Sequence, residues 1–165
     1  GWSWIVPEEL TSSYTCLMLH PSPLPKYRGG TPIQNQILDG ITDTKLTLFK
    51  MTAGVDDGPI LGQKDLSLRG NITSIFERLT SLGLELLEEY LRGDLTERAQ
   101  NDSEATYCTR RRPEDSEITL EEIHSASAQH LFDKIRALSD PYPNAFIRTS
   151  DNKKLVIKVA LVEQD

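Results

Sequence analysis

A histidine followed by a proline-rich loop is the first feature of this chain that could carry chemistry. In the stretch MLHPSPLPKYRGG (18–30), His20 ends a short apolar run and precedes Pro21, Pro23 and Pro25. Each proline fixes its own φ angle and restricts the residue before it, so the loop has few conformations to choose from. Such a loop suits a catalytic histidine that must be held still. A buried structural histidine bonded to a backbone carbonyl would also account for His20, and for a single histidine this simpler role is favoured.

A pair of carboxylates, Asp56 and Asp57, lies in the turn-rich stretch GVDDGP (54–59). Aspartate bonds readily to nearby backbone, so both could be turn formers, and two adjacent aspartates are weak evidence for magnesium. Alternatively, one of them pairs with His20, because a carboxylate favours the protonated, hydrogen-bond-donating form of an imidazole. Both loops follow predicted strands, and strand ends in α/β sheets tend to bind ligands. We therefore expect His20 and Asp56 within hydrogen-bond or single-water reach at the C-terminal edge of the sheet.

The stretch KYRGG (26–30) could bind an anion. Lys26 and Arg28 supply positive charge, and Gly29 and Gly30 expose backbone N–H groups where a helix is expected to begin. A solvated turn accounts for the same residues equally well.

A hydrolase triad is a further possibility, because Ser22 lies close to His20 and an aspartate is available in Asp56. The serine lacks the G-x-S-x-G setting that presents a nucleophile on a sharp turn. We therefore do not favour a hydrolase.

Composition excludes several classes of protein. The chain has 165 residues and a net charge of −7, which argues against a protein whose main task is to grip nucleic-acid backbones. No apolar run approaches the roughly 18 residues of a membrane span. Cys16 and Cys108 have no partners at metal-ligand spacing, so we expect reduced thiols, no metal site and a cytoplasmic protein without membrane contact.

The elements that must position these residues follow from hydrophobic periodicity and from the prolines and glycines that interrupt it. Thr31 and Pro32 are predicted to start a helix as N-cap and first helical residue, and Gly40 to end it. The longest predicted helix is capped by Asn71 or Thr73 and ends at Gly93. The predicted strands cover 1–6, 15–19, 44–51, 60–68, 145–149 and 154–162, and the predicted helices 7–14, 31–40, 73–92 and 127–138.

This order of elements predicts an α/β protein in two parts. Residues 1–98 would form the second half of an α/β layer domain, and 118–165 a small subdomain with a helix and a β-hairpin. Between them, 99–117 is polar and contains RRR (110–112), which is typical of a solvated linker.

The motifs together resemble those of the folate-dependent formyltransferases. LHPSPLPKYRGGTPIQNQILDG followed by LTLFKMTAGVDDGPIL contains the family's histidine, Ser-x-Leu-Pro loop, Arg-Gly, Pro-Ile and later aspartate, in the right order. RRRPEDSEI (110–118) and IRALSDPYPNAFI (135–147) extend the likeness into the small C-terminal domain of the methionyl-tRNA and sugar-nucleotide types. The resemblance implies the C-terminal part of a Rossmann-like formyltransferase domain, followed by a partial OB-like appendage.

The resemblance also implies site residues. His20 would polarise the formyl carbonyl of 10-formyltetrahydrofolate and stabilise the oxyanion, and Asp56 would orient His20 and relay protons while an amine attacks. The cofactor would contact the pocket residues Trp2, Trp4, Ile5, Val55 and Asp56. We assign the substrate contacts to Ser22, Lys26, Arg28 and Gly29.

Two departures from the family pattern open a rival hypothesis. The family usually has Asn as an oxyanion donor two residues before the histidine, where this chain has Met18, which cannot donate. The family's first, nucleotide-binding-type half would precede residue 1. A truncated or degenerate folate-binding module without turnover is therefore the alternative to an enzyme.

The amine acceptor is open at this point. A tRNA acceptor calls for a basic linker and a complete basic C-terminal barrel, whereas this chain is acidic and its predicted appendage has two strands. These features favour a nucleotide-linked amino sugar over an aminoacyl-tRNA.

Overall fold

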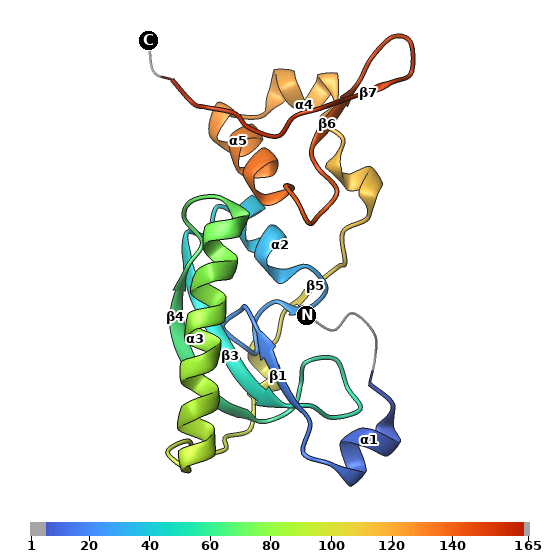
Figure 1. The fold of residues 1–165 in the computed structure, drawn as a ribbon. Coiled ribbons are helices and arrows are strands. Elements are labelled where there is room, and N and C mark those ends of the chain that lie inside the picture. The colour runs from blue at the N-terminus through green and yellow to red at the C-terminus, as the bar shows by residue number, and fades with distance from the viewer. Residues whose placement is uncertain (1–5, 164–165) are drawn as a thin grey trace.

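The computed structural model describes residues 6–163, which form a mixed α/β fold with a smaller subdomain at one end (Figure 1). The main sheet has the strand order β1-β3-β4, from β1 (Leu17–His20), β3 (Asp43–Lys50) and β4 (Ile60–Ser67). Both strand pairs are antiparallel, with Leu17 opposite Lys50 and His20 opposite Thr47. The predictions of strands at 15–19, 44–51 and 60–68 are confirmed to within about two residues.

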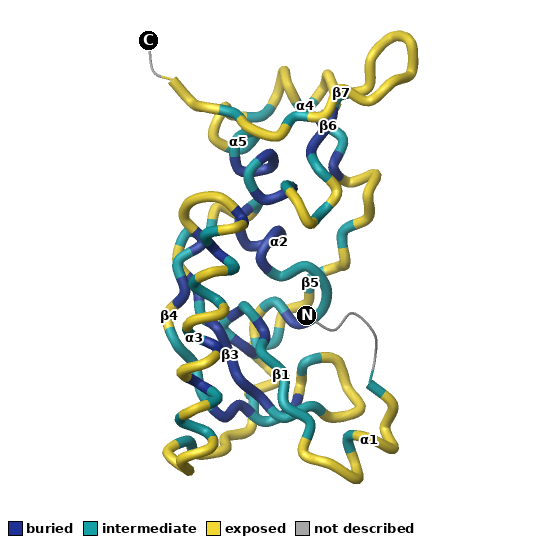
Figure 2. The backbone as a smooth tube through the Cα atoms, viewed as in Figure 1, coloured by how far each residue is buried: buried dark blue, intermediate teal, exposed yellow. Residues whose placement is uncertain are grey.

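The long helix α3 (Ile72–Arg92) lies along the sheet and closes the main core. Its apolar stripe, including the buried Ile75 and Leu86, packs against the sheet core around Leu46 and Leu48. The Asn71 side chain accepts the Ser74 N–H, and Gly93 ends the helix with φ 81°, as the sequence predicts. Figure 2 shows the buried residues on β3, on α2 and on the inner side of α3.

The helix α2 (Pro32–Leu38) begins at the predicted proline, but its predicted cap is wrong. Thr31 has a left-handed backbone, φ 49°, and its side chain caps no N–H of the helix. Its hydroxyl instead accepts the backbone N–H of Arg111 at 3.1 Å. A contact from a distant part of the chain therefore replaces the local cap.

Residues 98–112, here called the docked segment, lie against the main domain, whereas the sequence predicts a solvated linker there. Arg98 forms a bridge with Ile60, and β5 (Tyr107–Cys108) pairs in parallel with β2 (Arg28–Gly29). The loop that follows His20 is thus hydrogen-bonded to chain that comes about eighty positions later. The docked segment is consequently part of the structure that surrounds the candidate site.

The C-terminal subdomain has its own small core, formed by Ile118, Ile135, Leu138 and Ala145. It contains α5 (Ala128–Ala137), which is predicted, and α4 (Leu120–Ser125), which is not. The hairpin is formed by β6 (Phe146–Arg148) and β7 (Lys154–Val156), so the second strand is shorter than predicted.

This subdomain is attached to the main domain through α5. Ala137 is part of the main core, and Arg136 Nη1 donates to the carbonyls of Leu68 and Gly70 at 2.6 and 3.0 Å. The short helix α1 (Glu8–Ser13) lies at the opposite end of the molecule (Figure 1). Of the helices within residues 6–163, none has both the length and the apolar character required to cross a membrane.

Candidate active site

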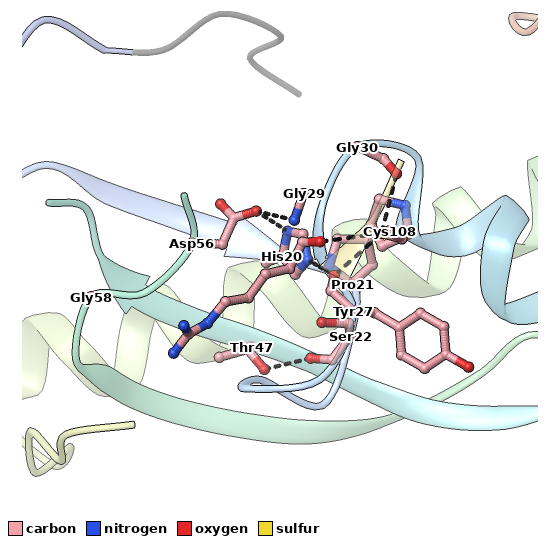
Figure 3. Close-up of polar contacts among 12 residues, drawn as sticks. His20, Pro21, Ser22, Tyr27, Gly29, Gly30, Thr47, Asp56, Gly58 and Cys108 are labelled. Carbon is pink, nitrogen blue, oxygen red and sulfur yellow. Dashed lines mark hydrogen bonds and ion pairs between the residues drawn. The ribbon is translucent and has the colours of Figure 1, made fainter. Parts of the chain in front are cut away.

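His20 lies at the end of β1 with its ring buried between the sheet and the proline-rich loop (Figure 3). Its Nε2 is 2.8 Å from the carbonyl oxygen of Tyr27. Because a carbonyl only accepts, Nε2 carries a proton and acts as the donor. The other ring nitrogen, Nδ1, is 3.6 Å from Asp56 Oδ2, which is longer than a hydrogen bond. Nδ1 thus lies beside a carboxylate and can still form a hydrogen bond with a ligand.

The distance from His20 to Asp56 agrees with the sequence-based prediction. The reason given for it, that the two strands end at the same edge of the sheet, is wrong. The strands β1 and β3 are antiparallel, so the loop after β3 leaves the sheet beside Leu17, at the end of β1 away from His20. The loop 51–59 has to fold back toward His20. Asp56 Oδ2 then accepts the backbone N–H of Gly29 at 2.8 Å, which fixes the carboxylate beside the imidazole.

The two adjacent aspartates have different roles. Asp56 faces His20, whereas the Asp57 carboxylate accepts a hydrogen bond from the Thr52 hydroxyl and is an exposed turn former. Both possibilities raised for this pair therefore occur, one at each residue. Within residues 6–163, no group of three or more His, Cys, Asp or Glu side chains is arranged to hold a metal ion.

Gly58 permits the return of this loop. A Cβ atom at Gly58 would lie 1.8 Å from the carbonyl oxygen of Lys50, which is backbone and cannot move aside as a side-chain tip could. We expect Gly58→Ala to reduce the free energy of unfolding by about 2–4 kcal/mol, measured by urea denaturation. At Gly40 nothing lies within 4 Å of such an atom, so Gly40→Ala should show only the cost of its φ of 77°, about 1 kcal/mol. Equal losses at the two positions would contradict the steric explanation.

Left-handed backbone at non-glycine residues is concentrated around this site. Tyr27, Thr31 and Asp56 have φ of 58°, 49° and 51°, and the only other such residue within 6–163 is Asn152 in the distant hairpin. Conformations of this kind cost about 1–3 kcal/mol each and persist where surrounding contacts enforce them. Tyr27 presents its carbonyl to His20 and Asp56 presents its carboxylate, so two of these three strained residues hold the ring.

Two of the predicted substrate contacts point into the protein. Ser22 is fully buried, and its hydroxyl donates to the Lys26 carbonyl at 2.7 Å within the same loop. Arg28 is 2% exposed and its guanidinium donates to Gln100, Asp102 and Tyr107 in the docked segment. Both side chains shape the loop instead of presenting charge or hydroxyl to solvent. Lys26 is exposed, and the Gly29 N–H is bonded to Asp56.

The side chains of Tyr27 and Cys108 add hydrogen bonds that support the loop. Burial, together with the hydrogen bond from Tyr27 to Asp39 at 2.8 Å, raises the pKa of Tyr27 to about 12. Burial also raises the pKa of Cys108, whose thiol donates to loop carbonyls, including that of Gly30 at 3.2 Å. Both groups therefore stay protonated donors near neutral pH. No periodicity or motif in the sequence marks them for this role.

Met18 lies on the same face of β1 as His20, because side chains alternate along a strand. It is partly buried against Leu24, Phe49 and Ile60. The position that the family resemblance assigns to an oxyanion donor is therefore next to the histidine, as expected, and holds an apolar side chain. Val55 is 48% exposed on the Asp56 loop. The predicted cofactor residues Trp2, Trp4 and Ile5 lie outside the described residues.

Comparisons with known proteins show which proteins this chain resembles. A family model described as formyl transferase matches residues 1–88. The methionyl-tRNA formyltransferase of Ehrlichia ruminantium is 35% identical over 167 aligned residues, covering 98% of this chain and 52% of that protein. The chain thus spans about half the length of the curated relatives it matches.

Two solved structures extend the comparison. The methionyl-tRNA formyltransferase of Clostridium thermocellum has a TM-score of 0.84 at 33% identity, covering 95% of this chain and 73% of that one. A sugar N-formyltransferase from a Shewanella species has a TM-score of 0.77 at 24% identity, covering 97% and 68%. The second likeness concerns the fold alone. With the family match over more than half of its residues, the chain belongs to the formyl transferase family.

Proposed function

We propose that the complete protein transfers a formyl group from 10-formyltetrahydrofolate to a primary amine. The observation that carries this proposal is the geometry of His20: Nε2 donates to a backbone carbonyl, while Nδ1 lies 3.6 Å from Asp56 and has no hydrogen bond to any residue within 6–163. When both of its nitrogens carry a proton, a ring held in this way can donate from Nδ1 to an oxygen that gains negative charge. Fixed donors of this kind are worth several kcal/mol in acyl transfer.

The residues present fit such a donor of a formyl group. When bound, 10-formyltetrahydrofolate supplies the electrophilic carbonyl, and the exposed apolar Val55 beside Asp56 offers a surface for its ring. As the amine forms its bond to the formyl carbon, a protonated His20 would donate from Nδ1 to the formyl oxygen and stabilise the charge that develops there. The bond from that carbon to the folate nitrogen would then break, and the proton given up by the amine would pass to the departing nitrogen. Asp56 serves as counter-ion to the protonated ring and, with its side chain 20% exposed, can accept a proton from the attacking amine.

Methionyl-tRNA is the acceptor we propose. The curated relatives at 32–35% identity carry the name methionyl-tRNA formyltransferase, whereas the sugar N-formyltransferases resemble the chain at 22–24%. This evidence outweighs the acidic charge and short hairpin that favour a nucleotide-linked amino sugar. A cytoplasmic location is part of the proposal, since both cysteines are free thiols.

Kinetics with both acceptors test the proposal. We expect kcat/KM of the complete protein with methionyl-tRNA and 10-formyltetrahydrofolate to exceed that with nucleotide-linked amino sugars by about 10²-fold or more, because the correct acceptor contributes binding energy to the transition state. The reverse preference would contradict the acceptor but support the reaction. Folate binding without transfer to any amine would favour the second candidate function, a binding module, which the apolar Met18 beside His20 makes a specific alternative.

A further inference from the structure

Gln100, in the docked segment, connects the two loops of the candidate site. Its Nε2 donates to the carbonyl oxygens of Asp56 and Gly58 at 2.8 and 2.7 Å. Its Oε1 accepts from Arg28 twice, from Nε at 3.1 Å and from Nη2 at 2.9 Å. A side-chain amide has two N–H donors and two acceptor lone pairs, so every hydrogen-bonding position of Gln100 is used.

The partners of Gln100 are the segments that the site depends on. Arg28 follows the His20 loop and is held in place by Asp102 and by the hydroxyl of Tyr107. The carbonyls of Asp56 and Gly58 belong to the loop that folds back from the far end of β1. The amide therefore joins a buried cation on one side of the site to the backbone that carries the carboxylate on the other.

The backbone of Asp56 requires such an anchor. Its φ of 51° is left-handed, which is unfavourable for aspartate unless neighbouring contacts hold it. Among residues 6–163, the Asp56 side chain has one hydrogen bond, from the Gly29 N–H, and it lies beside His20 without a hydrogen bond to the ring. Fixing the carbonyls of residues 56 and 58 fixes the direction in which the Asp56 side chain leaves the loop.

We propose that Gln100 is a positioning residue, which holds the Asp56 carboxylate against His20 and Gly29 by clamping the carbonyls of the Asp56 loop to Arg28. The catalytic part of this inference rests on the proposed formyl transfer. The geometric part is independent of that function. The Gly29 N–H donates to the Asp56 carboxylate, so its hydrogen exchange shows whether the carboxylate is in place even when no reaction occurs.

The variant Gln100→Glu isolates the clamp. A carboxylate keeps both acceptors for Arg28 and loses both donors to the loop carbonyls. We expect amide hydrogen exchange at Gly29 to accelerate by about tenfold or more, as the Asp56 side chain leaves its N–H. Exchange at Arg28 and Gly30, whose N–H groups donate to Thr106 and Cys108 in the docked segment, should change little.

Gln63→Glu is the matched control. Gln63 also donates twice, to the Leu24 carbonyl and the Thr47 hydroxyl, and also accepts from an arginine, Arg98. It has no bond to the Asp56 loop, so its variant should leave Gly29 exchange unchanged. Gln100→Met keeps the length of the side chain without its donors and should also accelerate amide exchange at Gly29. It provides the test if Gln100→Glu does not fold.

Kinetics in the complete protein test the catalytic part. Gln100→Glu should lower kcat by about tenfold or more with little change in the KM of the amine, because a misplaced catalytic group weakens the transition state. In an Asp56→Asn background the same substitution should have almost no further effect, whereas a merely structural role would give additive losses.

Unchanged Gly29 exchange in both Gln100 variants would overturn the inference, as would an equal acceleration in Gln63→Glu. Additive losses in the double-mutant cycle would overturn the role through Asp56. A wild-type protein that transfers no formyl group would refute the proposed function alone, and the exchange result would still decide whether Gln100 positions Asp56.

Discussion

His20→Ala in the complete protein is expected to abolish formyl transfer almost entirely, with kcat reduced by about 10³-fold or more. The substitution removes the ring nitrogen Nδ1 that faces Asp56, and with it both the proposed donor to the developing oxyanion and one step of the proposed proton path. Folate binding, measured by equilibrium titration, should change by less than about tenfold, because the histidine acts mainly on the transition state.

His130→Ala is the matched control for this variant. His130 Nε2 lies 3.5 Å from Glu122 Oε1, so it is also a histidine beside a carboxylate, but it lies in the C-terminal subdomain. Its removal should leave kcat within about twofold of wild type. A loss of less than tenfold in His20→Ala, equivalent to about 1.4 kcal/mol, would show that His20 is structural.

Met18→Asn is expected to raise kcat by about 10-fold to 10²-fold. Met18 shares a strand face with His20. An amide there would add a donor to the oxyanion, and one such donor is typically worth about 10²–10³ in kcat. The substitution also takes a thioether from the cluster of Leu24, Phe49 and Ile60, so we expect a loss of about 1–3 kcal/mol in the free energy of unfolding. Steady-state kinetics below the melting range separate the two effects.

Met51→Asn serves as its control, because Met51 packs against the same cluster but follows β3 instead of preceding His20. It should reduce stability similarly without raising kcat. A lower kcat in Met18→Asn than in a wild-type protein of good activity would show that Met18 packs usefully and that another group supplies the oxyanion donor. No transfer by either form, with folate still bound, would support the binding-module alternative.

Local sequence signals predict most of the elements but not how their loops are connected. The apolar stripe and the Asn71 and Gly93 caps define α3 because each lies within a few residues of the helix it shapes. The pair β2 and β5 has two residues in each strand, too few for any alternation to be visible, and its partners are far apart in the chain. Polar composition therefore suggested a solvated linker where the structure has a docked segment.

In the candidate site, too, local sequence predicts some features, whereas contacts with distant parts of the chain determine others. His20 and Asp56 are recognisable from their loops and from the family resemblance, and the structure places them 3.6 Å apart. The inward orientation of Arg28 could not be predicted, because a lysine, a tyrosine and an arginine before two glycines are equally typical of a surface turn. The acceptors of the docked segment, Gln100, Asp102 and Tyr107, make a buried guanidinium favourable there.

The docked segment also determines when the site can form during synthesis. A ribosome completes the His20 and Asp56 loops before it has made residues 98–112, so the newly emerged sheet still lacks the partners of Arg28 and Gly29. Contacts between such distant positions form late, because the entropy of closing a long loop must first be overcome. A nascent or proteolytically shortened chain that ends before Arg98 would keep the main sheet and α3 but leave the histidine loop without its support. Catalytic competence would then be acquired after most of the secondary structure, once the chain has grown beyond this segment.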